Sequence, residues 1–257
     1  MRRIYYIAVL IMVLCVACQW QLKPADANAS GRYIGIQRFD RIEMLYLTTG
    51  DYSAMQQMNT YFPTETRVLI EDMLHLGHVD DPEINVKFLY FYQDSTLQQM
   101  LSDVQKTFGN LEDIDEELMT VFRRLADMIP DLDVPSIYTQ IGSFDQSVVV
   151  SGGSLGISLD KYLGSDYPFY QNHYNEQERQ LMTRSMIVPD CLSFYLLSMY
   201  PLQQGHHQED RDLHMGRIMW TVNKVMKKQV FENPYVEAAG EYMKEHPKTE
   251  ITELLQL

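Results

Sequence analysis

The segment from Leu155 to Tyr170 constrains the fold of this chain more than any other, because a strand-like pattern ends there and a turn rich in aromatic residues begins. Every second residue from Leu155 to Leu159 is apolar, which is the period of a strand that buries one face. Asp160 stands where its side chain can cap a short helical turn, and Gly164 stands where a left-handed residue can end that turn. The segment therefore predicts a junction between a sheet and a helical part of the protein.

Four aromatic side chains and two carboxylates crowd into this junction. The aromatic residues are Tyr162, Tyr167, Phe169 and Tyr170, and the acidic residues are Asp160 and Asp166. Such a density favours a packing layer in which the tyrosine hydroxyls form local hydrogen bonds. Aromatic rings beside carboxylates also suit a surface that recognises a sugar or a peptide. These residues are therefore candidates for a structural or a partner-binding role.

The other periodicities predict an α+β fold in which helices surround a small, mostly antiparallel sheet. Strand-like runs stand at residues 33–36, 86–91, 137–141, 148–150 and 155–159. Short, glycine-containing connections join the last three runs and favour an antiparallel meander. The run at 86–91 leads directly into a helical pattern opened by Asp94, which would form a strand–helix unit.

Amphipathic patterns predict helices along most of the remaining chain. The expected ranges are 39–47, 51–61, 64–76, 94–108, 118–128, 176–200 and 210–228, followed by a last helix opened by Asn233 and Pro234. Pro189 interrupts the range 176–200, so a kink or a junction of two helices is expected there.

The N-terminus has the pattern of a secreted lipoprotein. Arg2 and Arg3 precede an apolar run from Ile4 to Val16, which has the length of a secretory signal. A small residue followed by Cys18 resembles a lipobox, so we expect Cys18 to carry the lipid once residues 1–17 are removed. Residues 18–31 would then form a tether, and residues 32–257 a single globular domain. An uncleaved membrane anchor is the alternative interpretation of the same run.

Charge and cysteine content narrow the classes of partner. Removal of residues 1–17 discards two positive charges and no acidic residue, so the formal net charge changes from −14 to −16. An acidic domain of this kind is repelled by nucleic acids and by anionic headgroups, so we expect membrane attachment through the lipid alone and no nucleic-acid partner. Cys191 is then the one remaining thiol, which excludes an intrachain disulfide and favours a buried, inert side chain.

One short motif is typical of a serine hydrolase. Residues 152–156 read G-x-S-x-G around Ser154, and Asp160 and His214 follow in the order of a hydrolase triad. A nucleophile elbow requires a strand before the serine and a helix after it. Strand-like runs stand on both sides of Ser154, so a hairpin turn is the favoured interpretation and a hydrolase the alternative.

Two groups of histidines are candidate metal ligands. They are His75 with His78, and His206, His207 and His214 close to acidic residues. Zinc sites need three or four ligands that converge at about 2 Å, and the spacing of these histidines does not predict such convergence. Solvated surface histidines explain both groups, so we expect no metal and no cofactor.

Several segments of the chain together resemble one protein family. They are Ile36–Asp40 (IQRFD), Ile129–Pro135 (IPDLDVP), Ile157–Gly164 (ISLDKYLG) with Asp166–Tyr170 (DYPFY), and Ile187–Asp190 (IVPD). In this order they are similar to the gliding-motility lipoprotein family GldB, and the likeness spans residues 33–228. The resemblance implies a lipoprotein of the cell envelope that faces the periplasm. It further implies a role with other envelope proteins in the gliding apparatus associated with type IX secretion.

The same family is distantly similar to predicted zinc peptidases that carry H-E-x-x-H on a helix. In that motif two histidines hold the metal and the glutamate activates water. The corresponding helix here would be residues 182–197, which contain neither histidine nor glutamate and have Pro189 and Asp190 near the place of the motif. The resemblance thus implies a degenerate zincin-like scaffold, a pseudoenzyme that assembles or stabilises a machine without catalysis. A periplasmic metal-dependent peptidase that uses the scattered histidines is the alternative.

Overall fold

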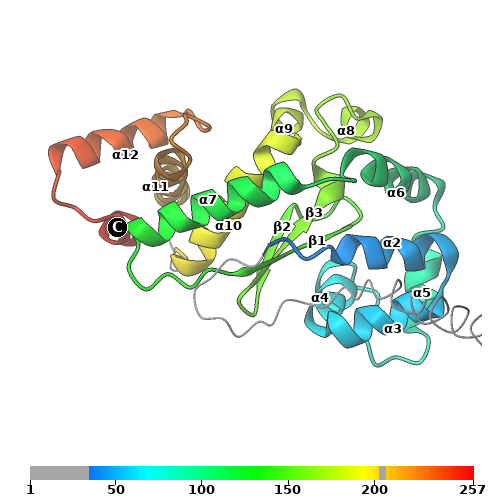
Figure 1. Cartoon of the computed structure of the whole chain (residues 1–257). Coiled ribbons are helices and arrows are strands. Elements are labelled where there is room, and N and C mark those ends of the chain that lie inside the picture. The colour runs from blue at the N-terminus through cyan, green and yellow to red at the C-terminus, as the bar shows by residue number, and fades with distance from the viewer. Residues whose placement is uncertain (1–34, 203–206) are drawn as a thin grey trace, which may run out of the picture.

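A computed structural model describes residues 35–202 and 207–257, and it places a small sheet at the centre of many helices (Figure 1). The α+β, helix-rich class predicted from the sequence is confirmed. The strands are β1 (Ser136–Gln140), β2 (Val148–Ser151) and β3 (Ser154–Ser158). The helices are α2 (Phe39–Thr49), α3 (Tyr52–Tyr61), α4 (Pro63–Arg67), α5 (Ile84–Phe91), α6 (Ser95–Thr107), α7 (Glu112–Met128), α8 (Pro168–His173), α9 (Glu176–Leu181), α10 (Ile187–Met199), α11 (Gln208–Met226), α12 (Pro234–Glu245) and α13 (Ile251–Gln256).

The sheet is mixed, and its strand order is β1-β3-β2. β2 and β3 form an antiparallel hairpin whose turn residues Gly152 and Gly153 both have positive φ, 57° and 80°. β1 pairs with β3, in parallel, whereas the expected meander would have paired β1 with β2, in antiparallel orientation. The reason is the longer connection 141–147, which carries the chain across to the far edge of the sheet.

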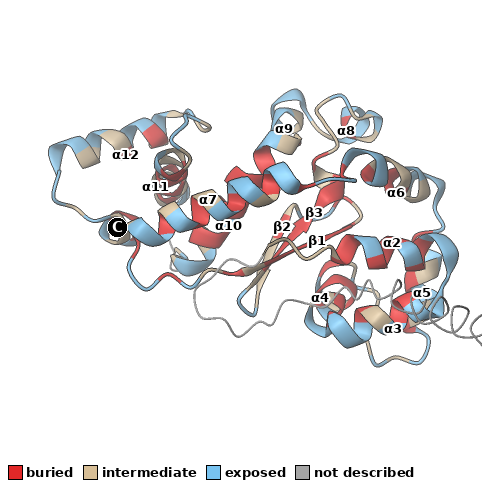
Figure 2. Cartoon of the chain, in the orientation of Figure 1, coloured by how far each residue is buried: buried red, intermediate tan, exposed pale blue. Residues whose placement is uncertain are grey.

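Helices cover the sheet and then extend away from it on both sides. α2 packs on β1, while α10 packs on β2 and β3 and also contacts α7 and α11. α11 in turn packs on α12, and these two helices form the end of the molecule opposite α3 to α5 (Figure 1). Figure 2 shows that β1, β3 and the inward helix faces are largely buried, whereas the outer face of α12 is exposed.

Several helices begin or end at the capping residues that the sequence indicated. Asp94 accepts hydrogen bonds from the backbone N–H groups of Thr96 and Leu97 at the start of α6. Asn233 caps α12 in the same way, and Pro234 occupies its first turn. Gly50 ends α2 in the left-handed region, with φ of 69°.

The expected strand at 86–91 is wrong, because these residues belong to helix α5. Ile84 and Phe88, one helical turn apart, are buried, while Val86 and Tyr90 are 69% and 78% exposed. A short apolar run reads equally well as a buried strand or a helix, and only this burial pattern separates the two. The strand–helix unit predicted at this position therefore does not exist.

Three other expectations are corrected in detail. Residues 64–76 form α4 followed by a π-helix over Val68–Met73 instead of one regular helix. Range 176–200 is divided into α9 and α10, but the break lies at residues 182–186 and Pro189 stands in the first turn of α10, where a missing N–H leaves no broken bond. Of the strand expected at 33–36, residues 33–34 lie outside the described residues, and the described contact is a parallel bridge from Gln37 to Tyr138.

Candidate functional site

Three buried carboxylates lie together at the end of β1, and we call Asp40, Glu43 and Asp160 the acid cluster. Their residues are 1%, 0% and 0% exposed. Asp40 and Glu43 come from α2, and Asp160 follows β3, which runs parallel to β1. A buried carboxylate is costly unless hydrogen bonds or counter-charges compensate it. The acid cluster is therefore the part of the molecule whose polar contacts most require an explanation.

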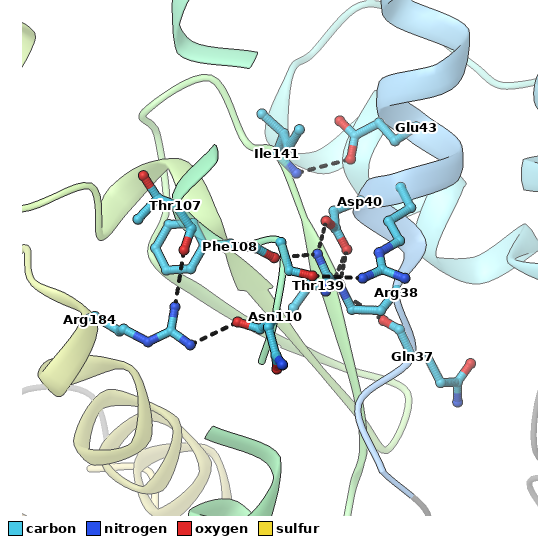
Figure 3. A network of polar contacts seen from close by, with 12 residues as sticks. Gln37, Arg38, Asp40, Glu43, Thr107, Phe108, Asn110, Thr139, Ile141 and Arg184 are labelled. Atoms are coloured by element: carbon cyan, nitrogen blue, oxygen red, sulfur yellow. Dashed lines mark hydrogen bonds and ion pairs between the residues drawn. The ribbon is translucent and has the colours of Figure 1, made fainter. Parts of the chain in front are cut away.

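Asp40 is compensated by an arginine from its own helix start. Arg38 donates from Nε to Oδ1 and from Nη2 to Oδ2, both at 2.8 Å, and this bidentate pair is the strong form of the ion pair. The Thr139 hydroxyl on β1 donates a further hydrogen bond to Asp40. Arg38 also donates to the carbonyl oxygen of Phe108 at 2.8 Å, so one network joins α2, β1 and the end of α6 (Figure 3).

A second arginine, Arg184, binds the same region as Arg38, namely the end of α6 and the loop that joins α6 to α7. It donates to the carbonyl oxygens of Thr107 and Asn110, at 3.3 and 2.9 Å (Figure 3). It also pairs with Asp113 at 2.6 Å. The last carbonyl groups of a helix have no partner within the helix, and a positive charge there is favourable. These arginines therefore stabilise the end of α6.

Glu43 is the least compensated member of the acid cluster. Its Oε2 accepts a hydrogen bond from the backbone N–H of Ile141 at 2.9 Å, while Oε1 has no hydrogen-bond partner among the described residues. Burial raises the pKa of Glu43 well above its usual range, and the nearby Asp40 and Asp160 raise it further against the effect of the Ile141 bond. The neutral form of this carboxyl is therefore favoured.

Asp160 holds the turn that follows β1. Its two carboxylate oxygens accept from the backbone N–H groups of Gly142 and Phe144, at 2.7 and 2.6 Å. The pKa of Asp160 is nevertheless raised, because burial outweighs these two hydrogen bonds. The expected role as cap of the turn that Asp160 begins is wrong, since the short 3₁₀-helix Leu159–Lys161 has no side-chain cap and the bonds reach back across the sheet instead.

A buried tyrosine–aspartate pair lies where α10 meets the aromatic turn, residues 160–170. The Tyr162 hydroxyl donates to Asp190 Oδ2 at 2.8 Å, and Tyr162 is 1% exposed. Burial raises the pKa of Asp190 to about 7, although the hydrogen bond from Tyr162 partly opposes this shift. The neighbouring Cys191 is fully buried, and burial also raises the pKa of its thiol, as expected for an inert side chain.

The aromatic turn itself is mostly a packing layer. Tyr170 is 0% exposed, donates to the carbonyl oxygen of Asp160 and accepts from the backbone N–H of Leu163 at 3.2 Å. Phe144 stacks on Phe169 with ring centroids 4.0 Å apart and meets Tyr170 edge-on.

Two other residues predicted to have a structural or partner-binding role, Tyr167 and Asp166, lie nearer the surface of this layer. Tyr167 is half-buried and donates to Asp103 at 3.3 Å, while Asp166 is exposed.

Comparison with protein families gives one match. Residues 21–232 match the family described as gliding motility protein GldB. The chain belongs to the GldB family. No curated protein and no solved structure matches it.

The segments that carry the GldB resemblance form side-chain hydrogen bonds around the sheet, and one of these bonds, from Tyr162 to Asp190, joins two of the segments directly. Asp40 bonds to Thr139, and Asp160 bonds to the turn after β1. Tyr162 bonds to Asp190, and the Tyr195 hydroxyl on α10 donates to the carbonyl oxygen of Asp133 in the segment 129–135. These segments, which are far apart in sequence, are thus held around one sheet by side-chain hydrogen bonds, either to one another or to β1, the turn after it and α10.

The GldB chain brings no metal-ligand set together in the part that the structure describes. No group of three or more His, Cys, Asp or Glu side chains there is arranged to hold a metal ion. His78 lies 3.5 Å from Glu71, and His75 and His207 are exposed, whereas His214 is buried in α11. His206 lies outside the described residues, as does Cys18. Across residues 35–202 and 207–257, no helix has both the length and the apolar character to cross a bilayer.

The G-x-S-x-G motif is a hairpin turn and not a nucleophile elbow. Ser154 is the first residue of β3, so a strand and not a helix follows it. Its hydroxyl lies 2.7 Å from that of Ser136 on β1. Asp160 is held by backbone N–H groups as described above.

Sequence reasoning missed Glu43 and the arginines of the network. Glu43 stands inside the buried stripe of α2 that also contains Ile42 and Leu47. An acidic residue within an apolar stripe is the signal that would have identified it. Arg184 had no comparable signal, because its partners lie more than 70 residues earlier in the chain.

Proposed function

We propose that this GldB-family chain is a non-catalytic lipoprotein of the cell envelope that assembles or stabilises the gliding machinery associated with type IX secretion. One observation carries the proposal. The polar groups of the family-signature segments are engaged in hydrogen bonds within the protein around the sheet, where they build the fold. Catalytic groups need access to a substrate, whereas Asp160 and Tyr162 are 0% and 1% exposed.

The surface of the N-terminal helices supports a role in assembly. Val86 and Tyr90 of α5 are 69% and 78% exposed, one helical turn apart, and Tyr52 of α3 is 60% exposed. Beside them, His75, Leu76, Lys87, Tyr90 and Phe91 line a hollow of about 710 Å³. Apolar side chains gathered on one face are typical of protein–protein contacts. We therefore assign partner binding to this α5 face, defined by Val86 and Tyr90.

Attachment to the membrane would come from the N-terminal lipid at Cys18, with the domain on the periplasmic side. In this proposal Cys18→Ser leaves the protein unprocessed or releases it from the membrane fraction. Firm membrane binding and normal processing of the Cys18→Ser variant would contradict the lipid anchor without affecting the assignment of the α5 face.

The decisive experiment compares metal content and partner recovery. Tagged full-length protein is crosslinked in native membranes and purified, as wild type and as the double variant Val86→Ser/Tyr90→Ser. The control double variant Leu181→Ser/Phe194→Ser removes exposed apolar side chains elsewhere, which are 51% and 39% exposed. We expect the α5 variant to lose its crosslinked envelope proteins while the control keeps them.

Two outcomes would overturn the proposal. Equal recovery of crosslinked proteins by the α5 variant and the wild type would remove the assigned partner face. Stoichiometric zinc or iron that survives dialysis of the purified protein would favour the metal-dependent peptidase instead.

A further inference from the structure

Helices α11 and α12 lie at the end of the molecule away from α5 (Figure 1). A groove lies between these two helices. Its volume is about 950 Å³, which is within the range of pockets that hold a small molecule. Trp220 and Lys224 come from α11, Lys227 and Lys228 from the segment that follows it, and Lys244 from α12. Four ammonium groups from different elements thus face one space.

These four lysines are unusual in a chain with 35 acidic and 21 basic residues. Exposed ammonium groups in so acidic a protein have many carboxylates available for pairing. Within the described residues, however, the ion pairs formed by lysines involve Lys87 and Lys106, and none involves a lysine of this groove. The groove is lined by these four lysines and by three glutamates, so it keeps an excess of one positive charge, and its ammonium groups, which form no ion pair among the described residues, can attract an anion.

Hydrogen bonds fix the wall of the groove that carries the lysines. Asn223 accepts from the backbone N–H groups of Val230 and Phe231, at 2.8 and 3.0 Å, and donates to the carbonyl oxygen of Phe231 at 2.8 Å. Lys227 has a left-handed backbone with φ of 56°, at a position where glycine is the usual residue. The N–H group of Lys227 bonds to the carbonyl oxygens of Asn223 and Lys224, so the end of α11 is held beside the groove.

Trp220 forms the floor of the groove and already orients one lysine. The Lys224 ammonium lies 5.0 Å from the centre of the indole ring, which is the geometry of a cation–π contact. Gly240 allows α12 to approach the indole, because a Cβ atom there would lie 3.1 Å from Trp220 Nε1. The indole edge and the lysines are therefore presented together.

Three glutamates also line the groove, and they restrict the kind of anion that can bind there. Glu232, Glu237 and Glu241 would repel a ligand that carries many carboxylates, but they can accept hydrogen bonds from hydroxyl groups. Lysines bind phosphate as point charges, and an indole packs against the apolar side of a small ligand. We propose that this groove binds a phosphate ester that carries hydroxyl groups, such as a sugar phosphate or a glycerophosphate headgroup.

Family membership does not supply this site. The match to the GldB family ends at residue 232, before α12 begins at Pro234. The wall that contributes Glu237, Glu241 and Lys244 therefore lies outside the matched region. The proposal is also independent of the non-catalytic role assigned above, because it concerns the opposite end of the molecule.

Tryptophan fluorescence tests the proposal in the full chain. The sequence contains two tryptophans, Trp20 and Trp220, so Trp20→Phe leaves the groove residue as the only indole. This protein, purified in an uncharged detergent, is titrated with glucose 6-phosphate, glucose and inorganic phosphate. We expect glucose 6-phosphate to change the emission and to bind at least about tenfold more tightly than either fragment, because the hydroxyl and phosphate contacts act together. Calorimetry on the same samples detects any binding that leaves the emission unchanged.

Two variants and two kinds of vesicle complete the test. Lys227→Glu/Lys228→Glu should weaken binding at least about tenfold, while Lys106→Glu/Lys248→Glu, an equal charge change outside the groove, should leave it within about twofold. Vesicles of phosphatidylcholine, with and without phosphatidylglycerol, distinguish a lipid headgroup from a free phosphate ester. A response to glucose 6-phosphate or to phosphatidylglycerol that the groove variant removes supports the proposal. No binding of either, or equal weakening by both charge variants, overturns it.

Discussion

Charged side chains have opposite environments in two regions of this molecule. In the acid cluster at the sheet, Asp40 and Asp160 are buried and each of their carboxylate oxygens accepts a hydrogen bond. In the groove between α11 and α12, lysines are exposed and form no ion pair with a described residue. Buried and satisfied polar groups specify one arrangement of the chain, whereas exposed and unsatisfied ones are available to a ligand. We infer that the acid cluster serves the fold and the groove serves recognition.

The first prediction concerns the aromatic layer beside the acid cluster. Tyr170→Ala should lower the free energy of unfolding by about 4 kcal/mol, because a fully buried aromatic ring is removed. Tyr170→Phe keeps the ring and loses the hydroxyl bonds to Asp160 and Leu163, so its cost should be about 1–2 kcal/mol. Urea denaturation measures both. A Tyr170→Ala variant as stable as the wild type would show that this layer is not part of the core.

The second prediction compares two glycines of the groove helices. A Cβ at Gly216 would lie 2.5–2.6 Å from backbone and Cβ atoms of Tyr235, so Gly216→Ala must displace the start of α12. We expect a loss of about 2 kcal/mol, because the overlap outweighs the better helix propensity of alanine. Gly240→Ala meets only the Trp220 ring at 3.1 Å and should change stability by less than about 1 kcal/mol. Thermal unfolding ranks the two variants, and the reverse order would contradict the packing described here.

The third prediction uses the raised pKa of Asp190, about 7. The native state then binds more protons than the unfolded state between the ordinary aspartate pKa near 4 and pH 7, so this group's contribution to stability falls as pH rises through 7. Asp190→Asn removes that dependence while the side-chain oxygen still accepts from Tyr162. The variant should match the wild type at pH 4 and exceed it by about 4 kcal/mol at pH 8. Urea denaturation from pH 4 to pH 8 checks this prediction. Equal pH dependence of the free energy of unfolding in the variant and the wild type would contradict the raised pKa of Asp190.

The fourth prediction separates stability from recognition within the groove. Lys227 has a left-handed backbone, which glycine adopts without a steric cost. Lys227→Gly should therefore raise the free energy of unfolding by about 0.5–1 kcal/mol and at the same time weaken phosphate-ester binding. Thermal unfolding and the fluorescence titration on the same sample test this opposition. A variant that is less stable and binds as well as the wild type would place Lys227 among the structural residues.

Local chemistry explains which parts of the fold were predictable. The starts of α6 and α12 were predicted because Asp94 and Asn233 bond to N–H groups two or three residues away. The parallel pairing of β1 with β3 and the bonds from Asp160 to the turn after β1 join residues 16–18 positions apart, and no local pattern encodes them. α5 was mistaken for a strand because apolar residues stand on all sides of it. The helical period becomes visible only in the structure, where Val86 and Tyr90 are exposed.

The candidate site was predictable only as a set of positions. The aromatic turn and Asp160 were identified from their density in the sequence, and Tyr162 and Tyr170 are indeed buried together with it. The contribution of α2 was not foreseen, because the contact between Glu43 and Ile141 spans 98 residues. The groove could not be predicted either, because it forms only when α11 packs on α12 and brings Lys224 and Lys244 to one space.

The most direct test of the central claim is the unfolding free energy of Asp160→Ala, measured together with partner recovery. If the signature residues build the fold, the two buried N–H groups of Gly142 and Phe144 lose their acceptors and stability falls by about 3 kcal/mol. The amount of crosslinked envelope protein recovered per folded molecule should then equal that of the wild type. Unchanged stability with lost recovery would contradict the account, because Asp160 would then act in recognition rather than in the fold.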